Sequence, residues 1–166
     1  IITVPLKERI KTYTMTLVAF GYDTGEEYFR CGTCFGQTVG RNCNRIANAQ
    51  VTIDGVTYQL EANDGTNNLH SGINGYENKV WDVERMDEEA NSVTLSCVSP
   101  DLEQGFPGTM TAHVTFALSE DHALSIHYEA TCDKDTVANF TNHSYFNLAG
   151  HDGGYMGDQM LKVYSS

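Results

Sequence analysis

Two runs of alternating apolar and polar side chains constrain the fold of this chain more than any other feature of its sequence. In residues 110–118 and 124–131, apolar side chains occupy the even positions and polar side chains occupy nearly all of the odd ones. Successive side chains of a β-strand point to opposite faces of a sheet. The period of two therefore predicts two strands, each with one face toward a core and one face outward.

Parity determines how these two strands pair. If their even-numbered residues share one face, the loop between them holds an odd number of residues. A loop over residues 119–123 satisfies this condition and pairs Leu118 with Leu124. The same register sets His113 opposite Glu129, and we predict this cross-strand pair on the outward face.

A shorter hairpin is predicted around Asp54-Gly55. Apolar residues alternate on both sides of this dipeptide, in residues 51–53 and 56–60. Asp-Gly tolerates the positive φ angles of a type I′ turn, so it is a strong hairpin signal between two alternating segments. Further strands are predicted at residues 14–20, 79–85, 92–98 and 137–140.

Helical signal is confined to residues 24–29. Thr24 can act as the N-cap there, and acidic residues follow it in the first turn. No repeat, low-complexity tract or linker divides the chain. We therefore predict an all-β protein, an antiparallel β-sandwich, that forms one domain over residues 1–166.

The charge balance narrows the class of partner. The 166 residues include 10 Lys and Arg against 22 Asp and Glu, which gives a formal net charge of −12. Such an acidic surface repels phosphate backbones and anionic headgroups, so no nucleic acid and no membrane is expected as a partner. No apolar run approaches the roughly 18 residues of a membrane-spanning helix.

The cysteine content predicts a cytoplasmic location. There are five cysteines, an odd number at low density, which favours reduced thiols over a disulfide scaffold. Cys31 and Cys34 have the spacing of a redox or zinc pair. No second ligand pair and no thioredoxin-like pattern accompanies them, so we interpret both as ordinary thiols.

Three segments concentrate Asn, His, Arg and aromatic residues, namely 40–48, 63–72 and 139–148. Amides and guanidinium groups form planar forks that match neighbouring hydroxyls, and an aromatic ring stacks on the apolar side of a sugar. This composition suits a neutral ligand with many hydroxyls. Asn-rich loops are more often simple turns, and composition leaves that alternative open.

The order of residues within these segments resembles the aldose 1-epimerases, the galactose mutarotases. Five motifs occur in the order and spacing of that family. They are Phe-Gly-Gln-Thr-Val-Gly-Arg at 35–41 with Asn-Arg-Ile-Ala-Asn at 44–48, Asn-Asn-Leu-His-Ser-Gly at 67–72 with Lys-Val-Trp at 79–81, Ser-Pro-Asp at 99–101, Gly-Phe-Pro-Gly at 105–108, and Thr-Asn-His-Ser-Tyr-Phe-Asn-Leu at 141–148. The resemblance covers the chain from about residue 21 onward.

The resemblance implies a large antiparallel β-sandwich that binds sugar across a concave face. It also implies interconversion of the α and β anomers of free aldoses such as galactose and glucose, with no metal or organic cofactor. His143 and His70 would be the catalytic residues, with His143 as general acid and His70 in contact with the sugar near the reacting centre. Asn44 and Arg45 would bind sugar hydroxyls, and Tyr145 would line the pocket.

Members of this family are considerably longer than 166 residues. The resemblance therefore implies a partial sandwich, incomplete at both ends, whose missing C-terminal part would be a partner. The family's general base is a glutamate in a later segment, and neither Glu77 nor Glu103 is assigned to that role. Ser71 also departs from the family pattern, which has a glycine after the motif histidine.

Each candidate residue has a structural alternative. His143 could be a core histidine that bonds the backbone, and the same holds for His70. Arg45 could pair with an acidic residue on this acidic surface. His113 and His127 fall on the outward strand faces, and we interpret both as surface residues.

The function therefore has alternatives from different classes. The chain could be a non-catalytic carbohydrate-binding module, which would keep the sugar contacts without a base. It could also be an incomplete, inactive fragment. Action on hexose 6-phosphates is less favoured, because no additional basic cluster is available to bind a phosphate.

Overall fold

The computed structural model describes residues 19–30, 32–121 and 123–164. The chain divides into two compact units, of which one comprises residues 38–142 and the other combines residues 1–37 with 143–166. Each unit is described by itself. Within the described residues, no helix has both the length and the apolar character needed to cross a membrane.

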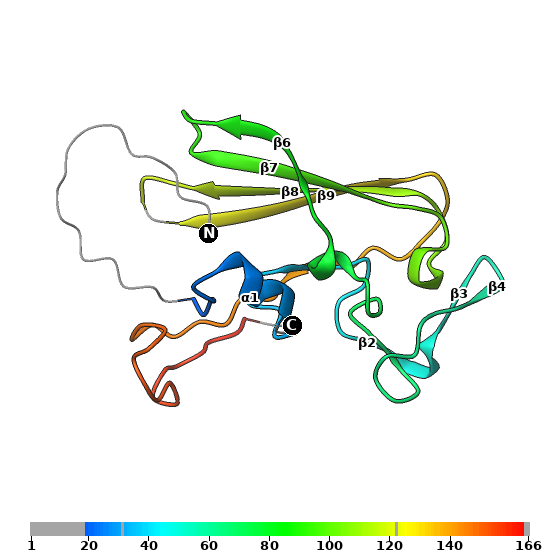
Figure 1. Cartoon of the computed structure of the whole chain (residues 1–166), viewed down its shortest axis with the longest axis horizontal. Helices are drawn as coiled ribbons and strands as arrows, with labels where there is room; N and C mark the ends of the chain where they lie inside the picture. Colours follow the sequence, from blue (N-terminus) through cyan, green and yellow to red (C-terminus); the bar gives the residue numbers. More distant parts are fainter. Residues whose placement is uncertain (1–18, 31, 122, 165–166) are drawn as a thin grey trace. The chain divides into compact units, whose positions relative to one another are not determined.

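A four-stranded antiparallel sheet is the largest element of the 38–142 unit (Figure 1). Its strands are β6 (Asp82–Asp87), β7 (Ser92–Ser99), β8 (Met110–Leu118) and β9 (Leu124–Cys132), paired in that order, so β6 and β9 are its edges. Three of the four lie close to the predicted ranges. The first was predicted at 79–85 and instead begins three residues later, at Asp82, and ends two residues later, at Asp87.

The pairing of β8 with β9 confirms the register that parity predicted. Leu118 pairs with Leu124, and His113 lies opposite Glu129. A backbone hydrogen bond of 3.0 Å closes the loop over residues 119–123. Local alternation was sufficient here because every paired residue lies within one hairpin.

His113 contacts a different carboxylate from the one its register suggests. Its Nδ1 lies 2.6 Å from the Glu84 carboxylate of β6, across the intervening strand β7. The register of β6 shifts between Val83 and Arg85, which leaves Glu84 as the extra residue of a β-bulge. A bulge redirects the side chain that it carries, and this explains how Glu84 reaches His113.

The Asp54-Gly55 hairpin is also confirmed. It joins β3 (Gln50–Ile53) to β4 (Val56–Gln59). Asp54 has φ 50° and Gly55 has φ 79°, so both central residues adopt the positive angles that a type I′ turn requires.

The remaining elements are short. They are the pair β1 (Thr38–Val39) with β10 (Thr141–Asn142), the pair β2 (Arg45–Ile46) with β5 (Asn68–Leu69), and the 3₁₀ turns η1 (Ala47–Ala49), η2 (Tyr76–Asn78) and η3 (Glu103–Gly105). The strand predicted at 137–140 is wrong, since Asn139 forms only an isolated bridge and β10 begins at Thr141. Val137 and Phe140 pack instead against two separate core clusters, so their apolar character serves packing rather than a sheet face.

In the other unit, the predicted helix is present as α1 (Gly25–Arg30). The backbone N–H and the hydroxyl of Thr24 both donate to the Glu27 carboxylate, at 2.9 and 2.8 Å. A glutamate in the first turn that accepts from the N–H of the N-cap residue is typical of a capping box, and it confirms that the helix begins after Thr24. The strand predicted at 14–20 lies outside the described residues except at its end, where Ala19 forms a bridge with Phe146.

The core of the 38–142 unit consists of two clusters of buried side chains. One contains Ala49, Leu60 and Phe106, and the other contains Tyr76, Met110 and Ala112. The Phe140 ring stacks on Tyr76 and on Tyr128, with centroids 5.7 Å apart in both pairs. A Cβ at Gly40 would lie only 2.6 Å from the Phe140 ring, so this close approach of backbone to aromatic rings requires glycine.

A buried arginine joins this core to the connection between β7 and β8. Arg41 is 2% exposed and donates to the Ser99 hydroxyl and to four backbone carbonyls, at 2.7–3.0 Å, and to the Thr136 hydroxyl at 3.4 Å. The four carbonyls belong to Ser99, Pro100, Pro107 and Gly108. Since a buried charge is costly unless its donors are all bonded, these contacts are what permits Arg41 to be internal.

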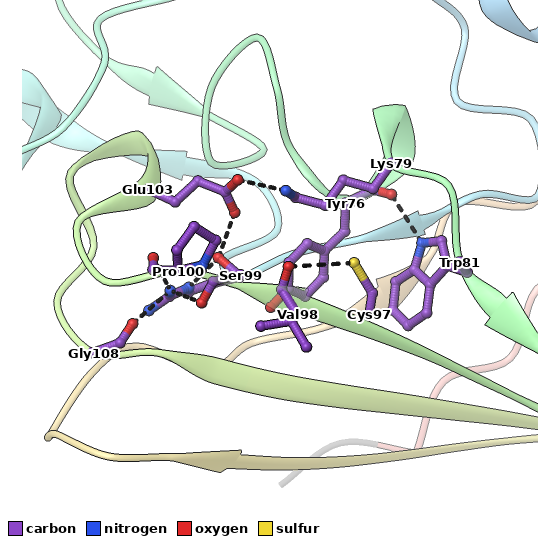
Figure 2. Close-up of polar contacts among 10 residues, drawn as sticks. Tyr76, Lys79, Trp81, Cys97, Val98, Ser99, Pro100, Glu103 and Gly108 are labelled. Atoms are coloured by element: carbon purple, nitrogen blue, oxygen red, sulfur yellow. Dashed lines mark hydrogen bonds and ion pairs between the residues drawn. The ribbon is translucent and has the colours of Figure 1, made fainter. Parts of the chain in front are cut away.

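The arginine is linked to an ion pair through Ser99. The Ser99 hydroxyl donates to Glu103 at 2.5 Å, and Glu103 pairs with Lys79 at 2.5 Å (Figure 2). Figure 2 also shows Trp81 bonded to the Tyr76 carbonyl, at 3.1 Å. Lys79 and Trp81, which were predicted to open this strand, are engaged in these contacts and precede β6.

Removing the Arg41 guanidinium should destabilise the protein severely. In Arg41→Ala, two hydroxyls and four carbonyls lose the bonds that the guanidinium donates in a buried site, and the free energy of unfolding should fall by about 3 kcal/mol or more. Arg85→Ala is the control, because the Arg85 side chain is 71% exposed and its pairing with Asp87 lies at the surface. Urea denaturation measures both. Equal midpoints for the two variants would contradict the central role of Arg41.

Candidate functional site

Two segments that carry predicted site residues are paired directly in the 38–142 unit. In the ladder of β2 with β5, Arg45 is the partner of Leu69. His70 follows Leu69, and its backbone N–H donates to the Asn44 carbonyl at 3.0 Å. The structure thus brings Asn44, Arg45 and His70 together.

The His70 ring is oriented by the backbone of the opposite segment. The Asn44 N–H donates to His70 Nδ1 at 3.0 Å. A ring nitrogen that accepts a hydrogen bond carries no proton, so in the neutral imidazole the proton is on Nε2. The contact with Asn44 therefore fixes the tautomer and the orientation of the His70 ring.

Arg45 forms the ion pair that was considered as an alternative to ligand binding. Its Nε donates to Asp64 Oδ2 at 2.7 Å, and the two side chains are 55% and 38% exposed. Among the described residues, this is the hydrogen bond that the Arg45 side chain makes. The pair uses Nε alone, so the two terminal amino groups of the guanidinium can still bind a ligand.

The segment that follows β4 is fixed largely by its own asparagines. Asn63 forms two hydrogen bonds with the backbone of Leu69: its amide donates to the Leu69 carbonyl at 2.8 Å and accepts from the Leu69 N–H at 2.7 Å. Asn67 accepts from the Asn48 N–H at 3.2 Å, and the fully buried Asn68 donates to the Glu61 carbonyl at 2.8 Å. The abundant amides in this segment therefore hold the backbone, as the turn interpretation predicted.

The backbone at these residues is strained. Asn44, His70 and Ser71 have φ angles of 64°, 54° and 70°, in the left-handed region that side chains disfavour. Strain of this kind persists only where the surroundings impose it, and it is concentrated at functional sites.

The contacts of Ser71 explain how a serine can replace the glycine that the aldose 1-epimerase pattern has at this position. Glycine would adopt φ 70° without penalty, whereas serine does not. The Ser71 hydroxyl compensates, because it accepts from the Asn42 N–H at 2.7 Å and donates to the Asn42 carbonyl at 3.3 Å. Ser71 is 2% exposed, so no solvent would replace these bonds.

His143 and Tyr145 lie together in the other unit. His143 is held by its backbone, whose carbonyl accepts from Gly36 at 3.2 Å and whose N–H donates to Gln37 at 2.9 Å. The rings of His143 and Tyr145 have centroids 5.0 Å apart, and Tyr145 meets Phe35 edge to face at 5.3 Å. Aromatic packing therefore supports the imidazole.

Sequence reasoning missed two residues that shape the site. One is Asp64, the partner of Arg45, and the other is Asn42, the partner of Ser71. Asp64 lies in an Asn-Asp-Gly turn, and the sequence predicts no more for it than membership of the polar segment 63–72. Nothing local in the sequence indicates that its carboxylate meets a side chain 19 residues earlier.

Among the described residues, Glu77 is the carboxyl near this site whose pKa is raised, because burial raises it to about 7. A Cβ placed on Gly75 would meet both the Glu77 carboxyl, at 2.5 Å, and the His70 carbonyl, at 2.6 Å, so these two groups flank Gly75.

The sequence model of the family described as aldose 1-epimerase matches residues 7–165. This chain belongs to the aldose 1-epimerase family. The aldose 1-epimerase of Haemophilus influenzae is 37% identical over 151 residues, and the galactose mutarotase of Bos taurus is 41% identical over 146 residues. These alignments cover 91% and 88% of this chain.

Solved structures give the same result for the fold. A GalM/aldose epimerase homologue from C. elegans superposes with a TM-score of 0.74 at 36% identity, over 80% of this chain and 40% of that protein. The galactose 1-epimerase from Lactobacillus acidophilus gives 0.71 at 31% identity, over 79% and 40%. The predicted antiparallel β-sandwich is confirmed. The chain spans about 42% of the length of the two sequence relatives named above.

Two substitutions at Ser71 should separate hydrogen bonding from backbone strain. Ser71→Ala keeps the strain and loses both bonds to Asn42, so the free energy of unfolding should fall by about 1–3 kcal/mol. Ser71→Gly loses the same bonds but relieves the left-handed residue, so it should be roughly 1 kcal/mol more stable than the alanine variant. Urea denaturation gives the order of the two, with the exposed Ser125→Ala as control. If glycine were no better than alanine, the strain argument would fail.

Stability should depend on pH through Glu77. Its carboxyl has an ordinary pKa of 4.5 and a pKa of about 7 in the folded protein, so between these values the folded state holds a proton that the unfolded state has released. Raising the pH through this window therefore lowers stability, and the loss is complete above pH 7. Glu77→Gln should remove this component from thermal melts at pH 5 and pH 8.

Asp87→Asn is the control for this pH effect. A backbone N–H from Ala90 lowers the pKa of Asp87 below its ordinary value, so its contribution is present above about pH 4 and is lost only in more acidic solution. The control should therefore keep the decline in melting temperature between pH 5 and pH 8. An unchanged decline in Glu77→Gln would mean that another group is responsible.

Proposed function

We propose that the whole protein is an aldose 1-epimerase that interconverts the α and β anomers of free aldohexoses such as galactose and glucose. The observation that carries this proposal is the assembly of Asn44, Arg45 and His70 on two paired segments, with a strained backbone and an oriented imidazole. The ligand would be a small neutral sugar. We place the protein in the cytoplasm, and we treat residues 1–166 as part of one sandwich domain.

The reaction opens and recloses the sugar ring. His143 donates a proton to the ring oxygen as the bond between that oxygen and the anomeric carbon breaks, because an alkoxide is a poor leaving group. A general base removes the proton of the anomeric hydroxyl in the same step, which gives the open-chain aldehyde. Rotation about the adjoining carbon–carbon bond and reclosure, with the two proton transfers reversed, gives the other anomer.

His70 would contact the sugar near the reacting centre. Because its Nδ1 accepts from the Asn44 backbone, the ring is already oriented before the sugar binds, so little orientational freedom is lost on binding.

Binding of the other hydroxyls would fall to Asn44, Arg45 and Tyr145. The terminal amino groups of Arg45 form a planar fork that matches two neighbouring oxygens, and Asn44 can both donate and accept. Tyr145 offers an aromatic face to the apolar side of the sugar. The mechanism uses no metal and no organic cofactor.

The general base would come from the part of the domain that the relatives have and that this chain does not span. We propose that this part packs with residues 1–166 to complete the site. A non-catalytic carbohydrate-binding module is the second candidate, because the sugar-binding residues of the 38–142 unit are assembled without an assigned base.

The optical rotation of freshly dissolved α-D-galactose tests the proposal. The full-length protein should accelerate mutarotation, and His143→Ala should lower kcat/KM by about 100-fold or more, since general acid catalysis supplies a factor of that size. His127→Ala, on the outward face of β9, is the matched control and should keep full activity. Sugar binding without acceleration by the unmodified protein would identify a binding module instead, and an active His143→Ala variant would exclude His143 as the acid.

A further inference from the structure

We propose that Asp64 is a positioning residue, which holds the Arg45 guanidinium by its Nε so that both terminal amino groups are available to two sugar oxygens. The inference deepens the proposed function and rests on it. It assigns a task to a residue that neither the motifs nor the chemistry of ring opening requires.

The geometry of the pair supports this assignment. A guanidinium has five N–H donors in a rigid plane, one on Nε and two on each terminal nitrogen. Asp64 takes the single Nε donor at 2.7 Å and makes no hydrogen bond to the terminal nitrogens. A carboxylate bonded to the two terminal nitrogens would have occupied the donors that a pair of sugar hydroxyls needs. The contact at Nε fixes the plane of the group and leaves that fork open.

Asp64 is itself held firmly. Its N–H donates to the Asn67 carbonyl at 3.1 Å, and its carbonyl accepts from the Asn67 N–H at 3.0 Å, so the two residues close a tight turn. The Asn67 side chain then accepts from the Asn48 N–H at 3.2 Å, three residues after Arg45. The carboxylate is therefore anchored to the same segment whose arginine it orients.

Stability alone does not account for the pair. Both side chains are substantially exposed, at 55% and 38%, and exposed ion pairs of this kind contribute little to folding. A free arginine side chain, in contrast, loses rotamer entropy when a ligand immobilises it. An arginine that is already held loses less, so the benefit of the pair appears on binding.

The first experiment observes the arginine without any sugar. In ¹⁵N spectra of the 166-residue chain, the Arg45 Nε–H should exchange slowly with water because it donates to Asp64. Asp64→Ala should accelerate this exchange about tenfold, and Asp64→Asn should lie between the two, because an amide oxygen still accepts but without charge. An Nε–H signal that does not change in Asp64→Ala would overturn the proposal.

Asp101→Asn is the control for this experiment and for the measurement of galactose affinity that follows. Asp101 forms an exposed ion pair with Lys134 at 2.6 Å, and its side chain is 37% exposed, close to the 38% of Asp64. It lies in the same unit and serves no proposed ligand. Neutralising it changes the net charge by the same amount as Asp64→Asn. The Arg45 signal and the galactose affinity should both stay as in the unmodified chain.

The second experiment measures galactose affinity in a double-mutant cycle. Asp64→Ala should raise the Kd for galactose about tenfold, Arg45→Ala should raise it at least as much, and adding Asp64→Ala to Arg45→Ala should change it less than twofold. Additive losses would mean that Asp64 acts independently of Arg45, which would overturn the inference.

The outcomes separate this inference from the proposed function. If Arg45→Ala weakens galactose binding and Asp64→Ala does not, the function stands and the role of Asp64 is wrong. If the unmodified full-length protein does not bind galactose at all, sugar recognition by these residues is wrong, and the positioning role falls with it. Thermal melts of each variant exclude loss of folding as the cause.

Discussion

The 38–142 unit depends on the burial of one positive charge. Arg41 is surrounded by neutral oxygens, four carbonyls and two hydroxyls, most of which come from the end of β7 and its connection to β8. The residue before it, Gly40, carries the backbone past two aromatic rings of the core, and the residues after it lead to Asn44 and Arg45. A single short stretch thus ties the sheet to the site, because Arg41 supplies donors to buried carbonyls of the β7–β8 connection.

The side chains of this site fall into two groups by task. Asparagine amides, the Ser71 hydroxyl and the Asp64 carboxylate bond to the backbone or to another side chain. In the proposed function, the terminal nitrogens of Arg45 bind the ligand. The contacts support the turn interpretation for most of these residues, and the sugar-binding interpretation of the few others belongs to the proposed function.

Sequence reasoning succeeded where the information is local. The β8–β9 register and the Asp54-Gly55 turn follow from alternation within one hairpin, and both are confirmed. It failed at residues 137–140, where apolar side chains serve packing against separate clusters, and at Asp64, whose partner is remote in the chain. Periodicity describes one strand and its neighbour. It does not specify which distant segment a side chain meets, and the candidate residues themselves came from resemblance rather than from pattern.

The two edges of the four-stranded sheet differ in how they would receive another strand. β6 carries three carboxylates and a bulge, and these features repel and misalign an incoming strand. β9 is longer, pairs with β8 without a register shift over nine residues, and has a single carboxylate, Glu129. Among the strands that the structure describes, β9 is therefore the edge that would offer a further strand the less resistance.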